Sequence, residues 1–516
     1  MYDILLRGGS VVDGTGAPLF RADVGVIGNK IAAIGDLSGQ AASLTLDADG
    51  LVVAPGFIDA HSHSDTSFLT DSSGASKLYQ GITTEITGNC GDSPFPCAGD
   101  GKDLSACVSF ERFLARFREG GYSMAVNQAL LVGHGTLRRC VIGDEGRAPT
   151  EAETEKMRHL LSRELAFGAW GLSLGLEYAP GCFAGQRELN LLGETVKRSG
   201  GIVTCHMRSE GLEIEKALEE LIEVGRFSGV RVNVSHLKID NYRVHGRAPE
   251  VWRIIEEAQK SGVLISADMY PYTASCTDLS IRCPKWSLDG GAEALLKHLA
   301  GPRRSEVVGG IRGHYFNAER AETCLICDDG GFWPAIVGKT LRFVAEELCR
   351  SDDYAETAAR ILERTKAQAR CIFFVMSPDD MLWFLRRDVG IGSDGYALPA
   401  DTAKLSSRPH PRSFGAISEF LHLAREEAIC PLEEAVRRIT AKPAFLFGLS
   451  GRGTLKIGNI ADVTVFDPST VAPRATYLNP VQTSVGVRHV LINGEPALLN
   501  GEQTEKRAGT FLRKGR

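Results

Sequence analysis

The sequence has neither a long apolar run nor a strong excess of charge. No stretch of about 18 apolar residues occurs, so we expect no membrane-spanning helix. The formal net charge of −6 is small for 516 residues, which argues against binding to a nucleic-acid backbone. The first residues, "MYDILLRGGSVVDG", lack the charged start and apolar core of a signal peptide. We therefore expect a cytoplasmic protein that acts on a small molecule, without membrane or nucleic acid, and that forms a homo-oligomer or a monomer.

The cysteines show no spacing typical of a disulfide framework. There are 13 of them, an odd number scattered along the chain, which suits a reducing compartment. The one CxxC motif, Cys324 to Cys327, has no second ligand pair at zinc-finger spacing. Packing is therefore favoured over a metal or redox role for this motif.

The two ends of the chain resemble each other in texture. Segments such as "ADVGVIGNKIAAIG" and "VRHVLINGEPALLNG" alternate short Val, Ile and Leu runs with Gly, Asn and Asp turns. Short strands at regular spacing are typical of a β-sandwich. We predict one small β-sandwich domain built from residues 1–55 and 440–516.

The middle of the chain alternates buried strands with amphipathic helices. Strands predicted by apolar runs cover residues 56–63, 82–87, 128–135, 171–178, 201–207, 230–238, 263–270 and 389–395. Eight strand–helix units predict a (β/α)8 barrel over residues 56–439. The gap before the last strand is too long for one helix, so we predict an inserted subdomain at about residues 285–370.

Metal-ligand residue types follow several of these strands. "GFIDAHSHSD" places two histidines two residues apart, on one face of an extended strand. In a barrel the active site forms at the carboxyl ends of the strands. The candidate ligands at those ends are His61, His63, Cys90, His206, His236 and Asp394. Imidazole, thiolate and carboxylate together favour Zn²⁺.

This ligand order resembles the amidohydrolase superfamily, and several motifs resemble its N-acyl-D-amino-acid deacylases (D-aminoacylases). The motifs include "PGFIDAHSHSD", "GITTEITGNCG", "GAWGLSLGLEYAPG", "HMRSE", "VSHLK", "YPYTAS", "GSDG" and "HPRSFG", and the resemblance covers about residues 1 to 467. It implies a tightly bound zinc held by Cys90, His206 and His236. It also implies a second, weaker site formed by His61, His63, Cys90 and Asp394.

The expected reaction is hydrolysis of the amide bond of an N-acyl-D-amino acid. Zinc lowers the pKa of bound water and polarises a carbonyl. Asp394, after the last strand, is placed to take the proton of the attacking water and pass it to the leaving nitrogen. By resemblance, Lys238, Tyr270 and Arg412 bind the α-carboxylate, and Lys238 shares a predicted strand face with His236.

Two residues have alternative interpretations, and two more are assigned supporting positions. Arg282, in the loop after the seventh strand, either binds an acidic substrate side chain or pairs with Asp278. His134 either faces the site or is structural. Glu177 and Tyr178 are assigned to supporting or packing positions.

Other functions remain open. The fourth strand, "GLSLGLEY", has no lysine to bridge two metals as in hydantoinases, and Cys90 takes that place. The sequence also departs from the resembling family at Asp92, Cys205 and Ser209, which affects substrate detail. The alternatives are a cyclic amidase or lactonase on the same fold, or a non-catalytic scaffold.

Overall fold

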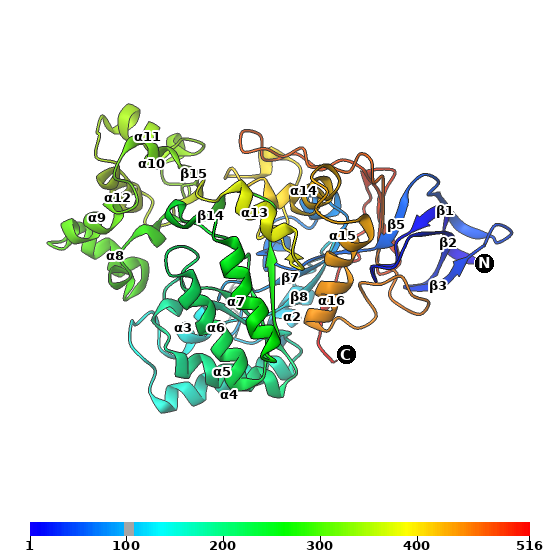
Figure 1. Cartoon of the computed structure of the whole chain (residues 1–516), viewed down its shortest axis with the longest axis horizontal. Coiled ribbons are helices and arrows are strands. Elements are labelled where there is room, and N and C mark those ends of the chain that lie inside the picture. The colour runs from blue at the N-terminus through cyan, green and yellow to red at the C-terminus, as the bar shows by residue number, and fades with distance from the viewer. Residues whose placement is uncertain (98–107, 516) are drawn as a thin grey trace.

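Parallel strands and helices alternate through the middle of the computed structural model, which describes residues 1–97 and 108–515 and is a mixed α/β protein (Figure 1). Each segment predicted as a parallel strand contains one. The strands are β6 (Phe57–Asp59), β7 (Ile82–Thr87), β8 (Asn127–Leu130), β9 (Val132–Gly133), β10 (Gly171–Gly175), β11 (Ile202–His206), β12 (Arg231–Val234), β13 (Ile265–Met269) and β17 (Gly390–Ile391).

These strands pair in chain order as β6-β7-β8 and as β9-β10-β11-β12-β13-β17. Backbone hydrogen bonds link the two sets at both ends. Trp170 N donates to Leu130 O over 2.9 Å, and Ala60 N donates to Ile391 O over 3.2 Å. Because the pairs are parallel, the carboxyl ends of all the strands lie on one side.

Amphipathic helices connect the strands. The sequence begins the longest of them with a capping box, in which Thr150 and Glu153 each bond the other's backbone N–H. The connecting helices are α1 (Ala75–Leu78), α2 (Phe110–Glu119), α3 (His134–Val141), α4 (Glu151–Ala166), α5 (Gln186–Arg198), α6 (Ile214–Ser228), α7 (Ala248–Lys260), α13 (Pro378–Leu385), α14 (Arg412–Glu426), α15 (Leu432–Arg438) and α16 (Ala441–Phe447). None of the helices in the described part of the chain is long and apolar enough to cross a membrane.

Several predicted strands are shorter than expected, among them the first, the sixth and the eighth. β6 ends at Asp59 and β12 ends at Val234, so the polar residues that follow lie in turns rather than on a strand face. The prediction that two pairs of residues share a strand face is therefore wrong. The pairs are His61 with His63 and His236 with Lys238. In the segment after β12, the backbone is no longer extended, since His236 takes a left-handed φ of 39°.

Strands from both ends of the chain form a separate sheet at one end of the molecule (Figure 1). They are β1 (Tyr2–Val11), β2 (Phe20–Ile27), β3 (Lys30–Gly35), β4 (Ala42–Asp47), β5 (Val52–Pro55), β18 (Val463–Phe466), β19 (Val487–Ile492), β20 (Glu495–Leu499) and β21 (Glu502–Gln503). Hydrogen bonds join all nine strands into one sheet, which differs from the two sheets of the predicted sandwich. The last strand, β22 (Phe511–Leu512), leaves this sheet and pairs with β8.

The long segment between β13 and β17 forms a body of its own at the opposite end (Figure 1). It contains β14 (Ser275–Asp278), β15 (Cys324–Asp328) and β16 (Arg370–Phe373) in a three-stranded antiparallel sheet. Its helices are α8 (Gly291–Ala300), α9 (Arg304–Arg312), α10 (Ala318–Glu322), α11 (Leu341–Phe343) and α12 (Tyr354–Arg364). A separate hydrophobic core running from Leu279 to Phe373 stabilises it.

A buried ion network connects β6 and β7 to the segment that follows β17. The ammonium of Lys77, on α1, lies 2.7 Å from Asp59 and 3.1 Å from Glu85, and all three side chains are fully buried. Lys77 also donates to the hydroxyl of Ser393 over 2.8 Å. The network thus holds β6, β7 and the segment after β17 together, directly beneath the polar residues at the strand ends.

Replacing Lys77 with methionine should destabilise the fold strongly. The change leaves Asp59 and Glu85 buried without a cation, and breaking one partner of a buried ion pair costs about 3–5 kcal/mol. Urea unfolding followed by circular dichroism measures the free energy of unfolding. Lys297→Met is the control, because Lys297 pairs with Glu293 on an exposed helix face and should change little. Equal stability of Lys77→Met and wild type would contradict this role.

Candidate active site

The six predicted ligand residues gather at the carboxyl ends of the parallel strands. His61 and His63 follow β6, Cys90 follows β7, and His206 is the last residue of β11. His236 follows β12 and Asp394 follows β17. Five of the six, all except the fully buried His61, line one cavity of about 570 Å³.

Cys90 lies at the centre of the first donor group. Its Sγ is 3.3 Å from His61 Nε2 and 3.3 Å from His236 Nε2. Asp394 Oδ1 lies 3.6 Å from His61 Nε2 and 2.9 Å from His63 Nε2. One donor atom from each of His61, Cys90, His236 and Asp394 lies within 4.8 Å of the others.

His236 also belongs to a second donor group, with His206 and Glu210. The ring centroids of His206 and His236 are 4.5 Å apart. Glu210 lies 3.0 Å from His236 Nδ1, and Glu177 lies 2.9 Å from His206 Nε2. Burial lowers the pKa of His206, but the carboxylates of Glu210 and Glu177 outweigh it and raise that pKa above its usual value.

Three of the donors have strained backbones. Cys90, His236 and Asp394 have φ values of 53°, 39° and 49°, in the left-handed region that residues with a Cβ rarely occupy. A Cβ atom on Gly175 would collide with the carbonyl oxygen of Cys90, so glycine is needed there. Strain of about 1–3 kcal/mol at each such residue persists only where the surrounding structure enforces it, as at functional sites.

The donor chemistry fits a zinc ion. Burial lowers the pKa of His61 well below its usual value and that of His236 to about 4, so both imidazoles are neutral. His61 Nδ1 and His206 Nδ1 are buried without a hydrogen bond. Ligands at the usual Zn–N and Zn–S lengths around a tetrahedral ion lie about 3.3–3.6 Å apart, close to the spacing around Cys90 Sγ.

A cationic cluster borders the same cavity. Two cations lie close to the Tyr270 ring, with Arg412 Cζ 4.6 Å and Lys238 Nζ 5.6 Å from its centroid. Arg412 also lies 2.8 Å from Asp394, and Lys238 lies 2.7 Å from Glu210. Burial raises the pKa of Asp394, but Arg412 and the neighbouring histidines outweigh it, so that pKa falls well below its usual value.

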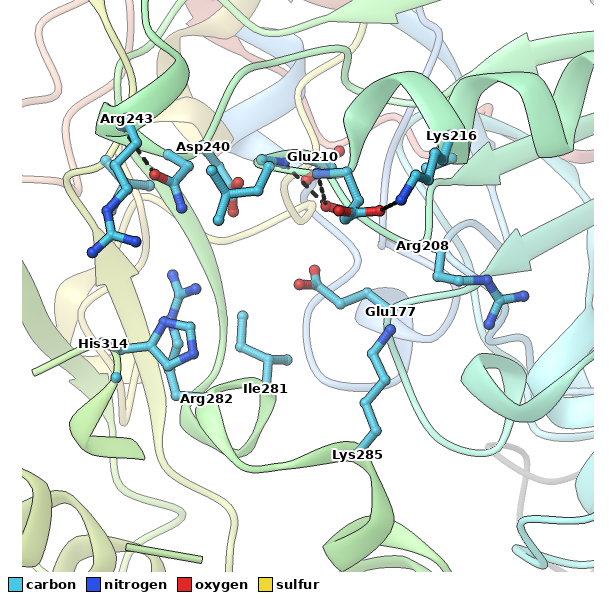
Figure 2. Close-up of a pocket in the computed structure, with 18 of the residues that line it drawn as sticks. Glu177, Arg208, Glu210, Lys216, Asp240, Arg243, Ile281, Arg282, Lys285 and His314 are labelled. Atoms are coloured by element: carbon cyan, nitrogen blue, oxygen red, sulfur yellow. Dashed lines mark hydrogen bonds and ion pairs between the residues drawn. The ribbon is translucent and has the colours of Figure 1, made fainter. Parts of the chain in front are cut away.

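Arg282 faces a different, neighbouring cavity of about 1130 Å³ (Figure 2). Its guanidinium lies 4.4 Å from the Phe373 ring centroid. The predicted pair with Asp278 is wrong, because Asp278 lies 3.6 Å from Arg370 instead. Within the described ranges 1–97 and 108–515, Arg282 has no ion pair or hydrogen bond. The two cavities share four wall residues, and Figure 2 labels all of them on the wall of the larger cavity: Glu177, Glu210, Asp240 and Ile281.

Of the two interpretations of His134, the structure supports a structural role. It is the first residue of α3, fully buried, and its Nε2 lies 2.8 Å from Glu188. Arg138 also contacts Glu188, and the three side chains form a buried cluster. His134 does not line the cavity of the metal-ligand candidates.

Two acidic residues that position the histidines were not among the predicted site residues. Glu210 bonds both His236 and Lys238. Asp268, the fourth residue of β13, accepts the backbone N–H of His236 over 2.8 Å and lies 3.6 Å from His61 Nδ1. The only sequence signal was proximity, since Glu210 follows His206 by four residues. Glu177 was assigned a supporting position and lies directly on His206.

Comparison with known proteins identifies the family of the chain. The model of the amidohydrolase family matches residues 44–236 and 394–497. A D-aminoacylase from Alcaligenes xylosoxydans xylosoxydans is 37% identical over 522 residues, which cover 99% of this chain and 97% of the relative.

Two solved structures match over almost the whole chain. The N-acyl-D-glutamate deacylase of Bordetella bronchiseptica, complexed with zinc and a phosphonate inhibitor that mimics the tetrahedral intermediate, has a TM-score of 0.84 at 34% identity and 99% coverage of both chains. A D-aminoacylase with a binuclear metal centre has a TM-score of 0.82 at 34% identity and 100% coverage. The chain belongs to the D-aminoacylase family of metal-dependent amidohydrolases.

Proposed function

We propose that this protein hydrolyses N-acyl-D-amino acids in a zinc-dependent reaction, releasing a carboxylate and a free D-amino acid. The observation that carries the proposal is that one cavity combines the His, Cys and Asp donors with the cations Lys238 and Arg412. The donors provide for cleavage of an amide, and the cations provide for recognition of a carboxylate. Full-length similarity to enzymes named for this substrate class supports the assignment.

The parallel strands that carry the site are the basis for a proposal about the fold. We infer that the parallel strands close into a (β/α)8 barrel, supported by the hydrogen bonds between β6 and β17 and between the segments around β8 and β10. The barrel spans about residues 56–439. Residues 1–55 and 440–516 form the accompanying β domain, and the insertion lies at about residues 285–370.

Zinc is proposed at two positions. Cys90, His206 and His236 would hold the tightly bound ion, and His61, His63, Cys90 and Asp394 would form a weaker second site. When bound, zinc lowers the pKa of a water molecule and polarises the scissile carbonyl. Burial raises the pKa of the Cys90 thiol well above its usual value, so Cys90 is protonated without metal and would have to give up that proton to act as a ligand.

The protein's own groups position the substrate and move the proton. Arg412 and Lys238 bind the α-carboxylate beside the Tyr270 ring, because a guanidinium can make two parallel bonds to a carboxylate. Asp394 is ionised, since Arg412 and the nearby histidines lower its pKa. It therefore accepts the proton of the attacking water and delivers it to the leaving nitrogen.

Arg282 is proposed to bind an acidic side chain of the substrate. The support is that its guanidinium lines the second cavity without any ion pair or hydrogen bond from the described residues. A charge-assisted bond to a substrate carboxylate is worth about 1.5–3 kcal/mol. An unchanged ratio of kcat/KM for N-acetyl-D-glutamate over N-acetyl-D-leucine in Arg282→Ala would contradict this assignment.

The function is tested directly with matched enantiomers. N-acetyl and N-formyl derivatives of D- and L-amino acids are incubated with the zinc-loaded protein, and the free amine is quantified. When the α-carboxylate and the scissile carbonyl of the substrate are both held in place, the two enantiomers direct their side chains to opposite sides of the site. If the site has room on one side only, kcat/KM for D-substrates should exceed that for L-substrates by about a hundredfold or more. Cyclic amides and lactones form the comparison panel. Equal rates on both enantiomers, or faster turnover of the cyclic compounds, would refute the proposal.

Replacing Asp394 with asparagine should lower kcat by about 10²–10⁴-fold, the usual contribution of general acid–base catalysis. Because Cys90, His206 and His236 are untouched, the tightly bound zinc should stay in the protein. Steady-state kinetics and metal analysis on one preparation measure both properties.

Asp401→Asn is the control, since Asp401 is exposed on the segment that follows the same strand. A kcat near the wild-type value in Asp394→Asn would rule out the proton-transfer role.

A further inference from the structure

Two side chains of opposite charge face the larger cavity without a partner. Asp240 and Arg282 both line it, and neither has an ion pair or a side-chain hydrogen bond to any residue that the structure describes. In Figure 2 the Arg282 side chain extends toward Asp240, and its guanidinium lowers the pKa of that carboxyl, which agrees with their closeness. Because the two groups do not pair with each other, each of them is open to a ligand.

Asp240 lies where the two cavities meet, since it is part of the wall of both. The other two carboxylates on this shared wall already have nitrogen partners. Glu177 lies 2.9 Å from His206 Nε2, and Glu210 lies 2.7 Å from the ammonium of Lys238. A substrate side chain that extends from the metal-ligand candidates into the larger cavity therefore passes an acid that has no cation of its own.

The neighbouring backbone sets the position of the Asp240 carboxylate. The backbone N–H of Asp240 donates to the carbonyl oxygen of Glu210 over 2.9 Å. A Cβ atom on Gly211 would lie 2.8 Å from Asp240 Oδ1, so the glycine leaves room for this carboxylate. The carboxylate is thus placed by its surroundings, although none of the described residues neutralises it.

A ligand that carries only one charge leaves one of the two groups unpaired. Burial and the Glu177 carboxylate raise the pKa of Asp240 to about 6, so this carboxyl is largely ionised at neutral pH. A substrate side chain with a carboxylate alone would bind Arg282 and also bring a like charge close to Asp240. A charge that is partly removed from water is costly unless an opposite charge pairs with it. A side chain with an ammonium as well as a carboxylate satisfies both groups.

We propose that the substrate side chain ends in an amino-acid zwitterion, whose carboxylate binds Arg282 and whose ammonium binds Asp240. The inference rests on the proposed deacylase function and extends the assignment of Arg282. The volume of the larger cavity, about 1130 Å³, is comparable to that of pockets that take up whole drug-sized molecules. The substrate class is an N-acyl-D-amino acid with a second α-amino acid group at the far end of its side chain, as in singly acylated α,α′-diaminoheptanedioic acid.

The test compares four N-acetylated substrates on the zinc-loaded, full-length protein. They are N-acetyl-D-leucine, N-acetyl-D-glutamate, Nα-acetyl-D-lysine and α,α′-diaminoheptanedioic acid acetylated at its D centre. Released acetate is measured, because two of the substrates already carry a free amine. In wild type, kcat/KM for the diamino diacid should exceed that for N-acetyl-D-glutamate by about tenfold or more, the effect of one charge-assisted hydrogen bond.

Two variants separate the contributions of the two charges. Relative to N-acetyl-D-leucine, Asp240→Asn should lower kcat/KM for the diamino diacid and the lysine derivative by about tenfold or more. Arg282→Ala should instead lower it for the diamino diacid and the glutamate derivative. Glu219→Gln is the matched control, because Glu219 is an exposed acid on the wall of the same cavity and should leave these ratios close to those of wild type.

Two results would overturn the inference. One is a wild-type protein that hydrolyses N-acetyl-D-glutamate as well as it hydrolyses the diamino diacid. The other is an equal change for all four substrates in Asp240→Asn, which would indicate a structural role. Failure of wild type to hydrolyse any of the four would argue against the deacylase function instead. The side-chain preference is then read from isothermal titration calorimetry with the same four compounds, which requires no turnover.

Discussion

The close approach of His61 and His236 to the Cys90 sulfur is the constraint on which the site depends. Two neutral, buried imidazoles each place Nε2 3.3 Å from the Sγ of a half-buried thiol. Desolvated polar groups are costly unless something binds them. The left-handed backbones of Cys90 and His236 add further cost, and that cost persists because the surrounding structure enforces it. A cation among these donors would offset both terms, which supports the proposed metal site.

The supporting residues explain why these donors hold their places. Asp268 accepts the backbone N–H of His236, and Glu210 lies on the Nδ1 atom of the same ring. Below them, the fully buried Lys77 pairs with carboxylates on β6 and β7 and donates a hydrogen bond to Ser393, which precedes Asp394. Metal ligands that are fixed by such partners keep their orientation and basicity. The insertion contributes the outer part of the cavity wall through residues such as Cys276, so it stands next to both the substrate clamp and the donors.

The sequence predicted a large part of this arrangement. Apolar runs located every parallel strand. Metal-ligand residue types at the strand ends include five of the six residues of the two donor groups, whereas the predicted ligand His63 belongs to neither group. The ends of the strands were wrong where the backbone turns left-handed, as at His236, because residue types there do not reveal a strained φ. Glu210 was missed because a carboxylate near a histidine is common in any chain. The partner of Asp278 was also wrong, since Arg370 is 92 residues away in sequence and is brought to it only by the pairing of β14 with β16.

The most direct test of the central claim is the zinc content of the purified protein, measured by inductively coupled plasma mass spectrometry together with its activity. The account predicts at least one tightly bound zinc per chain in wild type. His236 belongs to both donor groups, so His236→Ala should retain almost none, whereas His61→Ala should retain more. A wild-type protein that hydrolyses N-acyl-D-amino acids without any bound metal would contradict the account.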